Sequence, residues 1–364
     1  MARILVVGQV PPPYHGQAIA IRAMLAGDYP GHSLVFVPMR FSRSIDSIGR
    51  FAPTKLVELL LVVARIIRAR FRERPAILYY PPAGDTTTAV YRDLAVLGLT
   101  RWLFPKTVYH FHACGLLAHY QRSGPLKRAC IRLAYGEPSL AIINSRYNPP
   151  DADFLGARRT VEIMYGIDDR PPVQRDPSTA CPVLLMVAQL FPEKGLHDLL
   201  EALARVRERG LAFRLEVAGA FSSEAYRGEI KALLQRLGLT DAVRLLGQLT
   251  GEELLARYEA ADLFCFPSYH RSESLGIVLL EAMRAGLPVV ATRWRGIQSV
   301  VADGQSGFLF EPRAVPELAD RLALLLEDPA LRHRMGASGR ERFEAYFTRQ
   351  AWYERLTEAF DSLA

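Results

Sequence analysis

Short apolar runs alternate with helical patterns along the chain, and this alternation constrains the fold more than any other feature. The expected strands are 3–7, 34–37, 76–80, 107–112, 140–144 and 161–164, followed by 183–188, 214–218, 243–246, 263–266, 288–292 and 307–310. Helical patterns in the first half cover 17–26, 54–72, 86–102, 124–135 and 146–156. Continuous apolar strands separated by helices are typical of parallel sheets covered on both faces. We therefore expect an α/β fold with doubly wound, Rossmann-like sheets.

Two domains of similar size are expected, because 364 residues exceed what one small hydrophobic core supports. The stretch Asp168–Pro182 contains four prolines and few apolar residues, so we interpret 169–182 as a linker. It separates a domain at 1–168 from a domain at 183–347. An amphipathic helix at 348–364 could cross back to the first domain. Because ligands of such sheets bind at the carboxyl ends of the strands, the two domains are expected to face a central cleft.

Charge is distributed unevenly between the two halves. Residues 1–168 contain 21 Lys and Arg against 11 Asp and Glu, whereas residues 169–364 contain 24 against 27. This excess indicates an anionic partner for the first half, such as a phospholipid surface or a lipid diphosphate. Nucleic acid ranks last, because no RNA-binding pattern of basic and aromatic residues is present.

The four cysteines are scattered, which fits a reducing compartment and gives no evidence for a zinc site or a disulfide framework. The first residues predict a strand and are too short for a signal peptide. No stretch is long and apolar enough to span a bilayer. We therefore expect a cytoplasmic protein, with a possible peripheral place on the inner face of the membrane.

Glu273 and Glu281 stand eight residues apart in an otherwise apolar stretch. On a helix, Glu281 shares a face with Ile277 and Val278, where an ionised carboxylate is costly unless something pairs with it. A sugar or ribose hydroxyl would explain this glutamate. An ion pair with Arg284, three residues on, would explain it equally well.

Three predicted helix starts follow predicted strands and could bind an anion through their free amides. Gly16 opens the first helix, Lys194 and Gly195 precede the first helix of the second domain, and Ser274–Gly276 precede the helix of Glu281. Lys194 would add a positive charge for phosphate. The alternatives are an ordinary tight turn at Gly16 and a solvated loop lysine at Lys194.

His112 ends a predicted strand of the first domain, and strand alternation places His110 on the same face. Histidines are more often structural, but the carboxyl end of a strand favours a functional role for His112. The basic segment Lys55–Arg74 is a possible interfacial helix. For its apolar half we favour a crossover helix buried against the sheet, with the arginine end in solvent.

The run from Glu273 to Glu281, continued by Ala282-Met283 and by Pro288–Thr292, resembles the Glu-x7-Glu motif of the retaining glycosyltransferases of family 4. The resemblance covers nearly the whole chain and implies the GT-B fold. It implies that Glu281 binds the ribose of a nucleotide-sugar donor and that Glu273 lies beside the transferred sugar as a catalytic residue.

The same resemblance implies further donor-binding residues. It assigns the diphosphate to Lys194, Gly195, Ser274, Leu275 and Gly276, the glycine loop of the first domain to Gly16, a catalytic contact with the donor sugar to His112, and the nucleobase pocket to Gly219 and Leu246.

The chain departs from the family at Gln189, where relatives commonly carry an arginine, so that one positive charge on the diphosphate is missing. Arg293 or Arg295 could compensate only if the fold brings them close. The first-domain loop has one glycine, Gly16, where many relatives have two. The usual acidic residue near 295–298 is also replaced.

The resemblance implies transfer of a hexose-type sugar from a UDP- or GDP-linked donor to a hydroxyl of a glycan or lipid-linked acceptor, with no essential metal. Lys194 and the helix amides would stabilise the leaving diphosphate, and a carboxylate would steady the oxocarbenium-like sugar. The alternatives are a sugar-nucleotide epimerase, a disaccharide synthase, or a non-catalytic nucleotide-sugar-binding partner.

Overall fold

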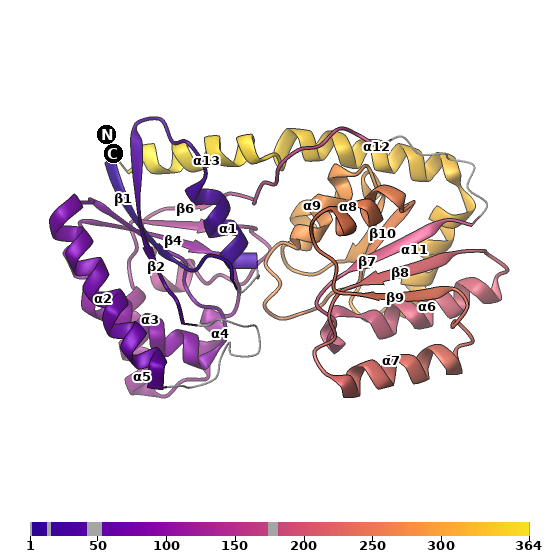
Figure 1. Cartoon of the computed structure of the whole chain (residues 1–364), viewed down its shortest axis with the longest axis horizontal. Helices are drawn as coiled ribbons and strands as arrows, with labels where there is room; N and C mark the ends of the chain where they lie inside the picture. The colour runs from indigo at the N-terminus through magenta and orange to yellow at the C-terminus, as the bar shows by residue number, and fades with distance from the viewer. Residues whose placement is uncertain (1, 13–15, 42–52, 174–180, 364) are drawn as a thin grey trace. The chain divides into compact units, whose positions relative to one another are not determined.

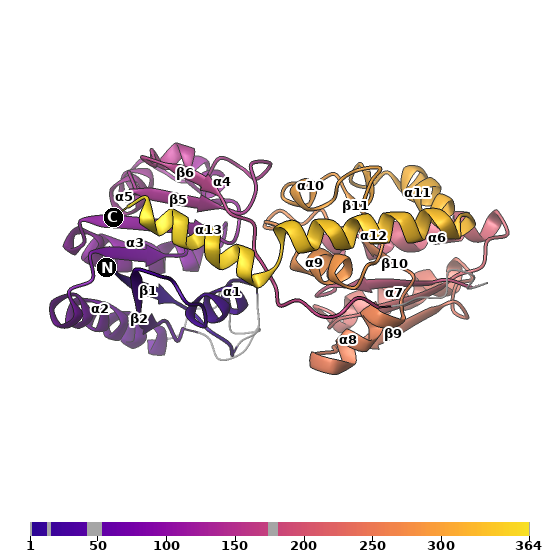
Figure 2. The ribbon, with the colours of Figure 1, turned by 90° about the horizontal axis from the view of Figure 1, so that it is seen from above.

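The computed structural model describes residues 2–12, 16–41, 53–173 and 181–363. The described chain forms two compact units (Figures 1 and 2). One contains residues 1–165 together with 350–364, and the other contains residues 166–349.

The first unit is built on a parallel six-stranded sheet in the order β2-β1-β3-β4-β5-β6. Its strands are β1 Ala2–Gly8, β2 His32–Pro38, β3 Ile77–Tyr80, β4 Lys106–Phe111, β5 Leu140–Ile143 and β6 Thr160–Glu162. Its helices are α1 Gly16–Leu25, α2 Pro53–Glu73, α3 Thr87–Thr100, α4 Leu116–Gln121, α5 Pro125–Tyr135 and α13 Arg349–Asp361, with short 3-10 helices η2 Arg101–Leu103 and η3 Asp153–Leu155.

Helices α2, α3 and α5 form one layer over this sheet, whereas α1 and α13 lie on the other side (Figures 1 and 2). The layer packs through Ile66 of α2, Val96 of α3 and Ile131 of α5, which are fully buried with Leu78 of the sheet. Apolar strands buried on both faces are what a parallel sheet requires.

The C-terminal helix α13 lies in the first unit (Figures 1 and 2). The Tyr353 hydroxyl donates to the Ala23 carbonyl at 2.7 Å, and His32 Nε2 lies 2.8 Å from Asp361 Oδ1. The Phe360 ring is buried against Tyr29 with ring centroids 5.8 Å apart. The amphipathic segment expected at 348–364 therefore packs on α1, on Tyr29 before β2, and on His32 of β2 and Tyr79 of β3.

The second unit contains a parallel six-stranded sheet in the order β12-β11-β10-β7-β8-β9. Its strands are β7 Val183–Val187, β8 Arg214–Ala218, β9 Val243–Gly247, β10 Leu263–Phe266, β11 Val289–Thr292 and β12 Gly307–Phe310. Its helices are η4 Pro192–Lys194, α6 Leu196–Glu208, α7 Glu224–Arg236, α8 Gly251–Ala260, α9 Ile277–Arg284, α10 Ile297–Val300, α11 Val315–Glu327 and α12 Pro329–Tyr346.

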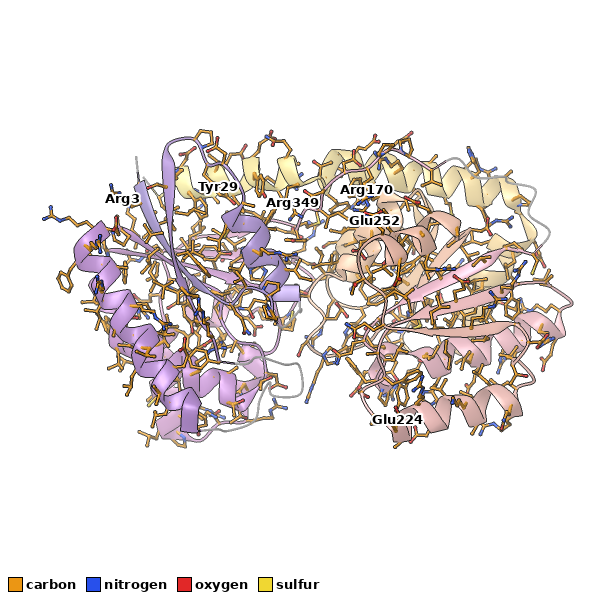
Figure 3. The ribbon with its side chains drawn as sticks, in the orientation of Figure 1. Arg3, Tyr29, Arg170, Glu224, Glu252 and Arg349 are labelled. Atoms are coloured by element: carbon orange, nitrogen blue, oxygen red, sulfur yellow. The ribbon has the colours of Figure 1, made fainter. Side chains whose placement is uncertain are left out.

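Residues 169–173, the described start of the expected linker, are held to the second unit. Arg170 pairs with Glu252 at 2.9 Å (Figure 3), and Asp169 lies 2.7 Å from Arg340. Residues 174–180 of the expected linker lie outside the described residues.

The expected strands are confirmed to within two residues at most ends, but one expected helix is wrong. Residues 146–156 form turns and the short η3, because consecutive Pro149 and Pro150 disfavour a helical conformation before them and lack N–H donors. Strand β4 ends at Phe111, so His112 follows the strand rather than ending it. In the described part of the chain, no helix is long and apolar enough to cross a membrane.

Replacing Phe360 by alanine should lower the free energy of unfolding by about 3–5 kcal/mol, because a fully buried aromatic ring is lost from the contact between α13 and the sheet. Glu358→Ala, an exposed position on the same helix, should stay within about 0.5 kcal/mol of the wild type. Chemical denaturation measures both values. Equal stability of the two variants would contradict this packing.

Candidate functional site

Strands β7 and β10 are neighbours in the second sheet although β8 and β9 separate them in sequence. The chain continues from β7 to one side of the sheet and from β10 to the other, which makes this pair a topological switch point. Open α/β sheets bind ligands at the carboxyl ends of such strands. The strands β7 and β10 lie side by side in Figure 1, and the loops that follow them carry Lys194 and Glu273, which the fold brings together.

Lys194 and Glu273 form an ion pair across the switch point. Lys194 Nζ lies 2.6 Å from Glu273 Oε2, and the Ser268 hydroxyl donates to the same oxygen at 3.2 Å. Each side chain of the ion pair is 13% exposed. Burial raises the pKa of Glu273, but the Lys194 charge and hydrogen bond outweigh it and hold this pKa below its ordinary value. The carboxylate is therefore ionised at neutral pH.

The Lys194 ammonium also lies above two aromatic rings, at 5.4 Å from the Phe191 centroid and 5.3 Å from the Phe266 centroid. Cation–π contacts of this kind stabilise a charge in partly desolvated surroundings. The ion pair and the two rings hold Lys194 beside the end of β10. Lys194 is therefore not the solvated loop lysine that the sequence left open as an alternative.

The loop after β10 is fixed by side chains that sequence reasoning did not select as site residues. Trp294 Nε1 donates to the His270 carbonyl at 3.0 Å, and the Thr292 hydroxyl donates to the Ser268 carbonyl. Burial and the nearby Lys194 charge lower the pKa of His270, so its ring is neutral beside the ion pair. In the sequence, these residues could have been found only from their position between a buried strand and Glu273.

Glycines allow the loops at this edge to touch. Gly195 has a φ of 75°, and a Cβ there would overlap the Pro267 carbonyl. A Cβ on Gly296 would overlap the Ser274 carbonyl, and one on Gly219 would overlap the Ala188 carbonyl. Gly276 caps α9 with a φ of 80°, a left-handed conformation that favours glycine. A side chain at Gly195, Gly219 or Gly296 would therefore push these loops apart.

Glu281 lies on α9 and accepts a hydrogen bond from the Tyr258 hydroxyl at 2.8 Å. Burial raises the pKa of Glu281, whereas the Tyr258 hydrogen bond and the Arg284 charge oppose the rise only in part. The Arg284 guanidinium donates to the Asp168 carbonyl at 3.1 Å. Tyr258, on α8, was missed because only the fold brings it to α9.

The remaining donor-site candidates of this unit follow neighbouring strands of the same sheet edge. Gly219 follows β8, its N–H donates to the Gly247 carbonyl at 2.7 Å, and Leu246 lies in β9 just before that glycine. Ser274 and Leu275 are buried in the turn before α9. Gln189 is exposed after β7.

Two arginines that could compensate for Gln189 have partners elsewhere. Arg293 pairs with Asp303 at 2.7 Å and with Glu311 at 3.2 Å. Arg295 donates to the Arg271 carbonyl and stacks on Trp294 at 5.3 Å. The carboxylate partners of Arg293 leave it no spare charge, whereas Arg295 is bonded to a neutral carbonyl and keeps its charge.

His112 of the first unit stacks on His110 with centroids 4.0 Å apart, as strand alternation predicts. The Tyr79 hydroxyl lies 2.6 Å from His110 Nδ1 and 3.4 Å from His112 Nε2, and His110 Nε2 lies 3.3 Å from the Asn144 amide oxygen. Burial lowers the pKa of His110 to about 4, so this ring is neutral at pH 7. Tyr79 and Asn144 thus hold the His110 ring in place against the His112 ring.

Gly16 begins α1 of the first unit, and the neighbouring Gln17 donates to the Pro81 carbonyl at 3.3 Å. Because β1 and β3 are adjacent, this bond crosses the switch point of the first sheet. Gly16 and His112 belong to one unit and the ten other candidates to the second, and the expected cleft between the units stays a prediction.

Among the described residues, no group of three or more His, Cys, Asp or Glu side chains is placed to hold a metal ion. Asp151 begins an Asp-x-Asp run, a pattern that can bind a metal ion. Both of its carboxylate oxygens instead accept backbone hydrogen bonds, from the Gly115 amide at 2.8 Å and the Leu117 amide at 2.7 Å.

Solved structures share this architecture over the full chain. Sucrose-phosphate synthase from Thermosynechococcus elongatus matches with a TM-score of 0.73 and 20% identity, covering 100% of this chain and 99% of that one. HepE of Anabaena in complex with UDP matches with a TM-score of 0.75 and 22% identity, covering 99% and 100%. These similarities establish the fold, which is the GT-B fold.

Curated relatives match about half of the chain. The alpha-D-kanosaminyltransferase of Streptomyces kanamyceticus is 34% identical over 185 residues, which are 51% of this chain and 44% of that protein. The glycogen synthase of Mycobacterium tuberculosis is 34% identical over 194 residues, covering 53% and 46%. The chain thus spans less than half the length of these relatives.

The fold and the β7–β10 switch point define a protein of two α/β units with the GT-B architecture. Residues 173–342 match the family described as Glycosyl transferases group 1. The second unit of this chain therefore carries a glycosyl transferases group 1 domain, as the sequence resemblance implied.

The stability of the first unit should fall as the pH falls from 6.5 to 4. His110 has its pKa lowered from 6.5 to about 4 by burial, so the unfolded chain takes up its proton first and unfolding becomes more favourable. The shift corresponds to about 3 kcal/mol. Urea denaturation at pH 7 and pH 4.5 should show a smaller loss for His110→Gln than for the wild type. An unchanged pH dependence in that variant would contradict a buried neutral His110.

Gly296→Ala should destabilise the chain by about 1–3 kcal/mol, because the added methyl overlaps the Ser274 backbone and forces the turn before α9 to move. Gly228→Ala is the matched control, since nothing lies within 4 Å of a Cβ at that helical position. Thermal unfolding of both variants tests the contact. A Gly296→Ala variant as stable as the control would show that the two turns do not touch.

Proposed function

We propose that this chain is a retaining glycosyltransferase that moves a hexose-type sugar from a nucleotide-diphosphate-sugar to a hydroxyl of a glycan or lipid-linked acceptor. One observation carries the proposal: the Lys194–Glu273 ion pair stands at the switch point of a glycosyl transferases group 1 domain. A cation for phosphate and a carboxylate for a sugar meet there within 2.6 Å.

The diphosphate of the donor is assigned to Lys194, Gly195 and the amides of Ser274–Gly276. Negative charge grows on this group as the sugar–phosphate bond breaks, and preorganised donors stabilise it without reorganisation. Lys194 donates to Glu273 Oε2 at 2.6 Å. Donor binding would exchange this carboxylate for phosphate, so no metal is required in the proposal.

Glu273 is assigned to the reacting sugar. Once Lys194 turns to phosphate, the carboxylate retains the Ser268 hydroxyl, which lies 3.2 Å from it. Its negative charge would steady the oxocarbenium-like sugar while the acceptor oxygen bonds to the anomeric carbon and the diphosphate leaves. His112, held by His110 and Tyr79, is assigned to the sugar from the first domain.

Glu281 is assigned to the ribose, because the Tyr258 bond orients its carboxylate on α9, the helix after the turn assigned to the diphosphate. Gly219 and Leu246 are assigned to the base. HepE of Anabaena was solved with UDP and with UDP-glucose, which favours UDP among the candidate donors. Reaction in the cytoplasm fits the free cysteines Cys114, Cys130, Cys181 and Cys265.

A panel of UDP, GDP, ADP and their sugars, followed by thermal unfolding, tests the donor assignment. A donor at a hundred times its dissociation constant should stabilise the chain by about 2.7 kcal/mol. Product analysis with this donor separates the alternatives: an epimerase converts the donor alone, a disaccharide synthase releases a free disaccharide, and a non-catalytic binding partner forms no product. Any of these outcomes would overturn the transfer proposed here.

Substitution of the two glutamates should change different kinetic constants. Glu281→Gln should raise KM for the donor at least tenfold with a smaller change in kcat, because a ribose contact is present before and during reaction. Glu273→Gln should lower kcat by about a hundredfold or more, because its charge acts on the developing cation. Glu224→Gln, an exposed control in the same unit, should match the wild type. Full activity of both site variants would refute the assignment.

Gln189→Arg should strengthen UDP binding by about tenfold, since it restores a charge-assisted contact to phosphate. Gln189→Met controls for side-chain length without charge. Calorimetric titration of UDP measures the difference, and equal affinities of the two variants would place residue 189 away from the diphosphate.

A further inference from the structure

Helix α2 is apolar on two opposite faces. Its inner face buries Val62 and Ile66 against the sheet, as the sequence led us to expect for a crossover helix. Its outer face carries Leu56, Leu60, Ile67 and Phe71, whose spacing places them on one stripe. Leu60 is 62% exposed and Phe71 70% exposed, so the apolar half of this helix is not buried as a whole.

The exposed apolar surface continues from α2 to α5 through η2. Arg70 donates to the Leu103 carbonyl at 2.6 Å, and Arg101 donates to the Leu133 carbonyl at 3.3 Å. Between these contacts, Trp102 is 59% exposed, and Leu133 is exposed beside Arg101. We call this surface the outer face, and it consists of Leu56, Leu60, Ile67 and Phe71 of α2, Trp102 of η2, and Leu126 and Leu133 of α5.

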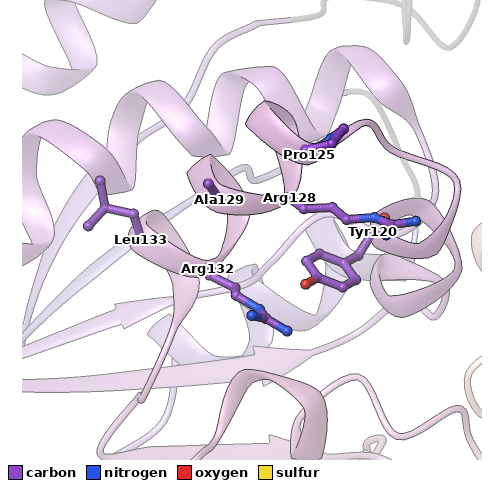
Figure 4. Close-up of a pocket in the computed structure, with 6 residues that line it drawn as sticks. All are labelled: Tyr120, Pro125, Arg128, Ala129, Arg132 and Leu133. Atoms are coloured by element: carbon purple, nitrogen blue, oxygen red, sulfur yellow. The ribbon is translucent and has the colours of Figure 1, made fainter.

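A basic groove of about 610 Å³ runs along α5 within the outer face (Figure 4). Its lining residues are Tyr120, Pro125, Arg128, Ala129, Arg132 and Leu133. The guanidinium carbons of Arg128 and Arg132 lie 5.5 and 5.4 Å from the Tyr120 ring centroid. Leu126, at the start of α5, is 81% exposed.

The cations of helix α5 lack acidic partners among the described residues, whereas Arg65 and Arg72 of α2 pair with Glu58 and Glu73. Helix α5 contains Lys127, Arg128 and Arg132 but no Asp or Glu. Arg128 donates to the backbone carbonyls of Tyr120 and Gln121, and Lys127 lies 4.4 Å from the Tyr91 ring centroid. Within the part of the chain that the structure describes, no carboxylate pairs with Arg128 or Arg132. Their charge is therefore available to an external anion.

We propose that the outer face docks on an anionic lipid bilayer, with the apolar side chains in the interfacial region and a lipid phosphate between Arg128 and Arg132. Large exposed apolar surfaces mark interaction sites, and arginines beside them favour anionic headgroups. A second copy of the chain would bring α5 cations together without carboxylates to pair them. Nucleic acid would leave Leu60 and Phe71 without an apolar partner. A bilayer satisfies both the charge and the apolar stripe.

Vesicle sedimentation with the full chain tests this proposal. Because it measures binding and no glycosyl transfer, a negative result would leave the proposed function untouched. The chain should sediment with phosphatidylglycerol-containing vesicles and much less with phosphatidylcholine vesicles, and salt should weaken the binding. The double variant Arg128→Gln, Arg132→Gln should lose about fivefold in affinity per arginine. Leu60→Ser with Phe71→Ser should lose at least tenfold, because two exposed apolar side chains no longer enter the lipid.

The matched controls lie in the second unit. Arg205→Gln with Arg236→Gln removes the same charge from exposed helical positions, and Leu324→Ser removes an exposed leucine. Both should sediment like the wild type, and thermal unfolding checks that all variants are folded. Equal recovery with neutral and anionic vesicles, no recovery with either, or equal losses in the controls would overturn the proposal. The proposal would also be overturned if the wild type did not bind vesicles but self-associated, and if Leu60→Ser with Phe71→Ser abolished that self-association.

Discussion

The ion pair between Lys194 and Glu273 is the interaction on which the account of this protein depends. It joins the loops after two neighbouring strands at the point where the second sheet reverses its order. Low exposure strengthens the attraction between the charges, and this attraction holds the pKa of Glu273 below its ordinary value although burial alone would raise it. The same low exposure makes the pair costly to break unless another anion takes the place of the carboxylate. A diphosphate is an anion suited to that exchange.

The surrounding backbone serves this contact. Gly195 lets the loop after β7 reach Pro267, and Gly296 lets the turn after β11 reach Ser274. A side chain at either position would prevent this close approach of the loops. In the first unit, the buried and neutral His110 orders the ring of His112 in a comparable way. Rigid strands thus hold the polar groups, while glycine and proline shape the loops between them.

The sequence was sufficient to locate the strands along the chain, because buried parallel strands are continuous apolar runs and helices separate them. It also located Lys194 and Glu273 after strands β7 and β10, and Glu281 on helix α9. The contact between Lys194 and Glu273 was not predictable from local pattern, since 79 residues separate them and only the sheet order makes them neighbours. The Tyr258 bond to Glu281 depends likewise on tertiary packing. The helix predicted at 146–156 is wrong, because Pro149 and Pro150 interrupt this segment.

The affinity of UDP for two variants tests the central claim most directly, because the claim predicts opposite effects from the two partners of one ion pair. Lys194→Met should weaken UDP binding at least tenfold, since the cation for phosphate is lost. Glu273→Gln should bind UDP as tightly as the wild type or several-fold more tightly, since Lys194 is released and a negative charge is removed. Calorimetric titration gives both dissociation constants. Unchanged UDP binding by Lys194→Met, or weaker binding by Glu273→Gln to the same extent as by Lys194→Met, would contradict the account.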